Sequence, residues 1–106
     1  MPNVDIEFQE RAQDRLALFI KKTAKGIEQG YDAGNCTPES EAFWTLYPKT
    51  ELSPGWRLLR IEIELEGLTE REIGAAVRRV GTEPEGVIEV FGKKVGYWRQ
   101  STDIPS

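Results

Sequence analysis

Apolar residues recur at intervals of three and four over residues 5–29, which is the spacing of one stripe along a helix. The stripe consists of Phe8, Ala12, Leu16, Phe19, Ile20, Ala24 and Ile27. Gly30 follows, and glycine commonly ends a helix. The pattern therefore predicts a long N-terminal helix. Val4, Ile6 and Phe8 also alternate with polar residues, so a short strand at the start of the chain is an alternative.

Two prolines enclose a second predicted helix. Thr37 precedes Pro38, an order typical of an N-cap followed by the first helical residue. Pro48 comes directly after Tyr47 and would end the helix. We therefore predict a short helix from Pro38 to Tyr47.

The second half of the chain contains both strand and helix patterns. Residues 57–66 alternate apolar and polar side chains, which predicts a strand with one buried face. Thr69 and Glu72 have the spacing of a capping box, and an amphipathic helix follows them. Residues 87–91 and 95–100 are separated by a short turn, so they predict a β-hairpin.

These elements predict an α+β fold. The long N-terminal helix and the short helix precede a β-α-β-β unit, whose strands form a three-stranded mixed sheet with the helices on one face. The chain has 106 residues, the size of one domain. We expect residues 1–106 to form a single globular domain with a disordered tail from about residue 101. The predicted core consists of Leu16, Ile20, Ile61, Ile63, Ile73, Val77, Ile88 and Val90.

The composition excludes several kinds of chemistry. The chain has no histidine and one cysteine, which rules out His-based acid–base catalysis, Ser-His-Asp and Cys-His nucleophiles, and most zinc sites. We therefore expect a non-enzymatic protein without a cofactor or a metal. Cys36 alone cannot form an intramolecular disulfide, and no apolar run is long enough to cross a bilayer. These features favour a cytoplasmic protein with no membrane partner.

Large aromatic residues near the predicted loops favour a protein-binding function. Tryptophan and tyrosine dominate binding hot spots because they bury a large area at a low cost in side-chain entropy. Charged neighbours would form a rim that sets register and on-rate. The predicted contact residues are Trp44, Tyr47, Trp56, Arg57, Arg60, Glu62, Glu64, Trp98 and Arg99. We expect an adaptor, regulator or inhibitor that binds an unidentified protein and can form a homodimer through an exposed sheet face or edge.

The predicted C-terminal hairpin supports a second interpretation. It combines cations with aromatic rings in Lys93, Lys94, Tyr97, Trp98 and Arg99. This combination suits single-stranded RNA or DNA, because bases stack on the rings while the cations neutralise phosphates. The formal net charge of -4 provides no general attraction to nucleic acid, so protein binding is the preferred interpretation.

Carboxylates on the strand at residues 57–66 leave two further alternatives. Glu62, Glu64 and Glu66 share one strand face, and residues 62–89 hold eight acidic and three basic side chains, a net charge of -5. Such a surface can imitate nucleic acid and inhibit a nucleic-acid-binding protein. The same row could hold a divalent cation in an enzyme, although no Asp-rich loop accompanies it. A solvated sheet face is the simplest explanation of the row.

Overall fold

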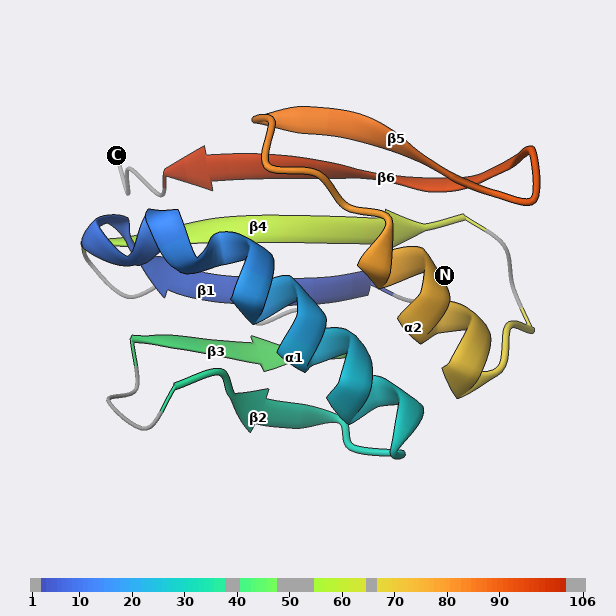
Figure 1. Ribbon diagram of the computed structural model, residues 1–106, viewed down its shortest axis with the longest axis horizontal. Helices are drawn as coiled ribbons and strands as arrows, with labels where there is room; N and C mark the ends of the chain where they lie inside the picture. Colours follow the sequence, from blue (N-terminus) through green and yellow to red (C-terminus); the bar gives the residue numbers. More distant parts are fainter. Residues whose placement is uncertain (1–2, 38–40, 48–54, 65–66, 103–106) are drawn as a thin grey trace.

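The computed structural model describes residues 3–37, 41–47, 55–64 and 67–102, and these residues form a 6-stranded antiparallel sheet with both of their α-helices on one face (Figure 1). The strand order is β2-β3-β1-β4-β6-β5. The strands are β1 (Asn3–Gln9), β2 (Ala33–Asn35), β3 (Ala42–Thr45), β4 (Trp56–Ile63), β5 (Glu85–Val90) and β6 (Lys93–Thr102). The helices are α1 (Leu16–Glu28) and α2 (Glu70–Arg78), and a 3-10 helix, η1 (Glu10–Arg15), precedes α1.

The sheet consists of two halves with the same arrangement of elements. β1, α1, β2 and β3 form the first half, and β4, α2, β5 and β6 form the second. In each half the last strand lies between the first strand and the strand at the edge of the sheet. β1 and β4 join the halves as antiparallel neighbours, with Ile6 opposite Leu59. The two halves are therefore related by an approximate two-fold axis that passes between β1 and β4.

A tryptophan packed on a glycine occupies the equivalent place in both halves. Trp44 on β3 lies opposite Gly34 on the edge strand β2, and a Cβ at Gly34 would lie 2.8 Å from Trp44 Nε1. Trp98 on β6 lies opposite Gly86 on the edge strand β5, and a Cβ at Gly86 would overlap the indole ring. Both glycines therefore leave the room that a buried indole needs. Gly26 of α1 also lies against Trp44, where a Cβ would be 2.5 Å from the ring.

The core lies between the sheet and the two helices. Alternate residues of the central strands supply its sheet side, namely Val4, Ile6, Phe8, Leu59, Ile61 and Ile63. α1 and α2 contact each other directly, because a Cβ at Gly74 would lie only 3.0 Å from the carbonyl oxygen of Ala24. Arg78 Nε also donates a hydrogen bond of 2.9 Å to Glu28 Oε1. Of the predicted core residues, all are buried except Val90, which is partly buried.

The predicted long N-terminal helix is wrong for residues 5–15. Residues 3–9 form β1, and α1 begins only at Leu16 after the 3-10 turn. The strand alternative is correct, because Val4, Ile6 and Phe8 face the helices while Asp5 lies on the opposite face. Residues 3–9 form a strand rather than a helix because β1 pairs with β3 on one side and with β4 on the other.

The short helix from Pro38 to Tyr47 is also wrong. Residues 42–45 form β3, and Ala42 and Trp44 are buried on the helix side of the sheet. Thr37 does accept a hydrogen bond, of 3.0 Å, from the backbone N–H of Glu41. This contact serves the connection between β2 and β3, because serine and threonine side chains cap turns as well as helices. Residues 38–40 and 48 lie outside the described residues.

The three-stranded mixed sheet is replaced by the antiparallel one. β6 lies between β4 and β5, so β4 and β5 are not neighbours and do not form a parallel pair. The capping box at Thr69 and Glu72 is confirmed, with the side chain of each accepting a hydrogen bond from the backbone N–H of the other. β6 continues through Thr102, while residues 103–106 and Glu66 lie outside the described residues.

Candidate functional site

The sheet face opposite the helices carries the polar residues of the central strands. Register and strand alternation place them there, because side chains of paired residues point to the same face. We call this surface the helix-free face, and it comprises Asp5, Glu7, Phe43, Trp56, Leu58, Arg60, Glu62, Glu85, Val87, Tyr97, Arg99 and Ser101. Both described helices lie on the other face (Figure 1), so the members of this set that are not buried are the candidates for recognition, whereas Asp5 and Glu7 are buried.

A partly buried ion pair fixes one arginine on this face. Arg60 on β4 donates two hydrogen bonds to Asp5 on β1, of 2.9 Å from Nε and 3.0 Å from Nη2. Asp5 is only 2% exposed, and a buried carboxylate requires such a partner. This hydrogen bonding to Asp5 raises the pKa of the Arg60 guanidinium. Arg60 is therefore permanently charged and held in one orientation, with Nη1 outside the pair.

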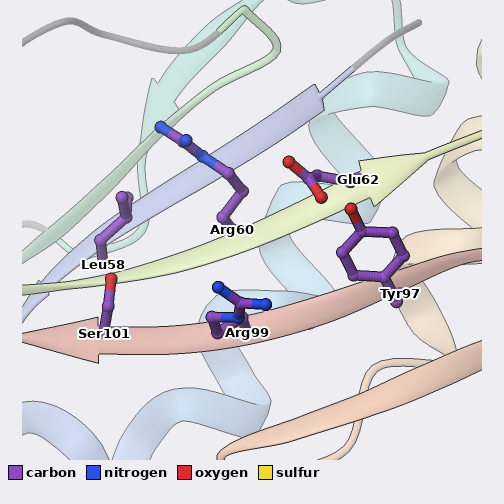
Figure 2. A pocket seen from close by; sticks show the side chains of 6 residues that line it. All are labelled: Leu58, Arg60, Glu62, Tyr97, Arg99 and Ser101. Carbon is purple, nitrogen blue, oxygen red and sulfur yellow. The ribbon is translucent and has the colours of Figure 1, made fainter.

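A second arginine stands directly opposite the first. Arg60 and Arg99 are register partners on β4 and β6, and like charges at directly opposite positions destabilise a sheet. Of the ion pairs between described residues, none includes Arg99. Figure 2 shows Arg60 extending toward β1 while Arg99 stands over β6. Asp5 already pairs with Arg60, and Glu85 on β5 is the other register partner of Arg99. An anionic group from outside would therefore act by accepting further hydrogen bonds from the two guanidinium groups.

The two arginines lie in a hollow of about 310 Å³. Its lining comes from both strands and combines charged, aromatic and apolar side chains: Leu58, Arg60, Glu62, Tyr97, Arg99 and Ser101 (Figure 2). A second hollow of about 400 Å³ lies toward β5 and shares Tyr97 and Arg99 with the first. Tyr97 and Arg99 therefore form a ridge between two hollows.

Carboxylates lie near Tyr97, at the end of the ridge away from Arg99. The Tyr97 hydroxyl points toward the Glu62 carboxylate (Figure 2), and hydrogen bonding to this carboxylate raises the pKa of Tyr97. Lys94 Nζ lies 3.7 Å from Glu64 Oε1 and 6.0 Å from the centroid of the Tyr97 ring. The helix-free face therefore presents both signs of charge around an aromatic ring, with the arginines at one end of the hollow and a carboxylate at the other.

The predicted aromatic contacts separate into two groups. Trp44 and Trp98 are 3% and 7% exposed on the helix side of the sheet, and Trp98 Nε1 donates a 3.1 Å hydrogen bond to the carbonyl of Glu83. Neither indole offers contact area to a partner. Trp56 is half-buried on the helix-free face, with its ring centroid 5.1 Å from that of Phe43, and Tyr47 is 66% exposed just after β3.

The predicted charged residues also fall on different faces. Arg57 lies on the helix side, with its guanidinium 5.8 Å from the centroid of the Phe8 ring, so it does not join Arg60. The hairpin set for nucleic acid is divided as well. Tyr97 and Arg99 lie on the helix-free face, Trp98 is buried on the other, and Lys94 is paired with Glu64.

Sequence reasoning missed Asp5, Leu58 and Ser101 as site residues. The helix predicted over residues 5–29 begins at Asp5, and the signal that favours a strand there instead is the alternation of Val4, Ile6 and Phe8. Nothing in the sequence could have identified Leu58 and Ser101, because they become neighbours only through the register of β4 and β6.

Other chemistry has little support in the described part of the chain. No group of three or more His, Cys, Asp or Glu residues could hold a metal ion there, and no helix there is long and apolar enough to cross a membrane. Cys36 is buried, and burial raises the pKa of its thiol. Comparison of the chain with protein families, curated proteins and solved structures finds no match.

Proposed function

We propose that this chain is a non-enzymatic protein-binding module whose helix-free face takes up an acidic side chain of a partner protein. The observation that carries the proposal is the pair of arginines, Arg60 and Arg99, directly opposite each other in a hollow. A carboxylate between them would accept hydrogen bonds from two guanidinium groups, and such charge-assisted bonds are about twice as strong as neutral ones.

The surroundings of the pair favour a protein over a free anion. Tyr97 and Leu58 give the hollow aromatic and apolar walls, which can contact the carbon atoms next to a carboxylate. Arginine and tyrosine are also enriched among the residues that dominate protein interfaces. Asp5 holds Arg60 in place before binding, so less side-chain entropy is lost when a partner arrives.

Single-stranded nucleic acid is the second candidate, since Lys94, Tyr97 and Arg99 lie along one strand. Carboxylates weaken this candidate, because Glu62 and Glu64 lie beside the ring and the lysine. They would repel a phosphate backbone that follows the strand. A partner that presents both charges fits the surface better. We also propose a cytoplasmic location, which the single, buried thiol of Cys36 supports.

The test is selection of peptides from a random displayed library on the folded protein. We expect enrichment of peptides that carry Asp or Glu next to apolar residues. Binding of the selected peptides should weaken at least tenfold for Arg99→Glu, which corresponds to about 1.4 kcal/mol. Lys21→Glu makes the same charge change on the exposed surface of α1 and should leave binding unchanged.

Two outcomes would overturn the proposal. The first is enrichment of basic peptides or of none. The second is equal binding by the Arg99→Glu and Lys21→Glu variants. Fluorescence titration with mixed-sequence single-stranded RNA tests the second candidate on the same protein. Quenching that weakens steeply with added salt would favour nucleic acid, because phosphate contacts lose affinity as salt rises.

A further inference from the structure

A groove on the helix side of the molecule lies apart from the hollow between the arginines. It has a volume of about 550 Å³ and lies between α2 and the β5–β6 hairpin, whose turn extends past the end of β4 (Figure 1). Mostly apolar atoms line it, with charged groups at the rim, and the residues are Leu68, Arg71, Glu72, Ala75, Val90, Phe91, Lys93 and Val95. The groove has the size of a site for one or two large side chains.

Phe91 beside this groove is unusual in two ways. Its side chain is 96% exposed, and its backbone has a φ of 53°, followed by Gly92 with a φ of 77°. Two successive positive φ angles are typical of a tight hairpin turn in which asparagine, aspartate or glycine is the usual first residue. A bulky side chain there is strained. The ring therefore costs folding energy and buries almost nothing within its own chain.

We propose that the groove is a self-recognition site, in which Phe91 of one copy inserts into the groove of a second copy and receives the second copy's Phe91 in return. The protruding ring of Phe91 lies beside the apolar groove of its own chain. In a two-fold dimer the same surface patch of both copies is in contact, so each ring can enter the other copy's groove only if Phe91 and the groove belong to one patch. Phe91 itself lines the groove, so the patch meets this condition.

The charges at the rim support a second copy as the occupant. Lys93 follows Phe91 closely on the hairpin, while Glu72 and its neighbour Arg71 lie on α2 across the groove. Insertion of Phe91 brings Lys93 of one copy toward Glu72 of the other, and the two-fold axis forms this pair twice. Thr69 binds only Oε1 of Glu72, at 3.1 Å from its backbone nitrogen and 2.9 Å from its hydroxyl, which leaves Oε2 outside the capping box.

The β5 edge of the sheet is a less suitable place for self-association than the groove. β5 is an edge strand with Glu85 and Glu89 among its residues, and antiparallel pairing of two β5 strands would bring these carboxylates together. Charged residues of this kind protect sheet edges from pairing. Apolar side chains make up most of the groove, so two copies that meet there would not bring Glu85 or Glu89 together. We therefore favour the groove over the β5 edge as the contact between copies.

The test is sedimentation velocity of the full chain over a hundredfold range of concentration. We expect the average mass to rise with concentration from 12.0 kDa to roughly twice that value, as for a closed two-fold dimer. Phe91→Ser should weaken dimerisation at least about tenfold, the effect of losing a central aromatic anchor. Tyr31→Ser removes another exposed ring, on the loop after α1, and should leave dimerisation unchanged.

Two further variants separate the contact from the fold. Phe91→Asn places a residue that tolerates positive φ in the turn. It should abolish the dimer, and at concentrations where the wild type is also monomeric it should raise the thermal unfolding midpoint. Glu72→Gln keeps a capping box, which accepts glutamine, but removes the charge that faces Lys93. It should weaken dimerisation severalfold, with an effect that disappears at high salt.

A chain that remains monomeric over the whole range overturns the inference, as does a Phe91→Asn variant that dimerises like the wild type. Neither result bears on the arginines, since the groove and the hollow share no residue. Peptide binding by the helix-free face should persist in the Phe91→Asn monomer.

Discussion

The two halves of the sheet share the same tryptophan–glycine packing but are covered by helices of different length. In both halves a tryptophan on the inner strand packs over a glycine of the edge strand. The first half covers its strands with η1 and a 13-residue helix, whereas α2 of the second half has 9 residues. Beside the shorter helix lie an apolar groove and an exposed Phe91 at the end of the β5–β6 hairpin. Equivalent cores therefore support different surfaces.

The helices also begin by different means. Thr69 and Glu72 cap the start of α2, whereas α1 follows η1 with no side-chain hydrogen bond at its N-cap, Arg15. α1 therefore depends on the core for its position, with Leu16, Phe19 and Ile27 almost fully buried. A short helix needs its cap more, because few turns share the cost of starting it.

The largest expected effect tests whether the two tryptophans are equivalent. Trp44→Ala and Trp98→Ala should each lower the free energy of unfolding by about 3–5 kcal/mol, the cost of removing a large buried side chain. Urea denaturation followed by far-UV circular dichroism measures it. Tyr47→Ala is the control, since an exposed ring should contribute less than about 0.5 kcal/mol. A loss at one tryptophan alone would break the equivalence of the halves.

The glycines opposite the tryptophans should give the next largest effect. Gly34→Ala and Gly86→Ala should each cost about 1–3 kcal/mol, because the added methyl group meets an indole ring in a packed core. The overlap is closer at Gly86, so that variant should be the less stable. A double-mutant cycle with Trp98→Phe supplies the control. Independence of the two substitutions would contradict direct packing of Gly86 on Trp98.

The smallest expected effect concerns the contact between the halves. The hydrogen bond from Arg78 lowers the pKa of Glu28 below its ordinary value of 4.5. A lowered carboxyl pKa stabilises the fold above pH 4.5, and this contribution is lost as the pH falls through the folded value. Solvent screening limits it to roughly 0.2–1 kcal/mol. Urea denaturation at several pH values from 7 to 3 gives the free energy of unfolding as a function of pH. This free energy should fall less steeply with falling pH for Glu28→Gln than for the wild type. Equal slopes would show that the Arg78–Glu28 pair contributes nothing.

Local signals predicted the second half of the chain better than the first. The alternation over residues 57–66, the capping box and the hairpin each depend on residues close together in sequence, and each forms the predicted type of element, although β4 ends at Ile63 and residues 65–66 lie outside the described part of the chain. In the first half, the residues of β1 satisfy both helical and strand spacing. The choice between them depends on β3 and β4, which lie far along the chain.

The candidate site was only partly accessible to sequence reasoning. The sequence marked Arg60, Glu62, Tyr97 and Arg99 as interaction residues, although in two competing sets. Their convergence depends on the register between β4 and β6, which no local pattern specifies. The same register places Trp98 on the other face of the sheet, where it is buried.

The amino-acid sequence by itself determined the inventory of this protein and its strongest local elements. The absence of histidine, the single cysteine and the capping box of α2 are properties of composition and of near neighbours. Only the tertiary structure decided that two β-α-β-β halves meet at β1 and β4, that Asp5 orients Arg60, and that Arg99 faces it. The physical reason is that strand pairing joins residues far apart in the chain, so its energy depends on partners that local sequence does not reveal.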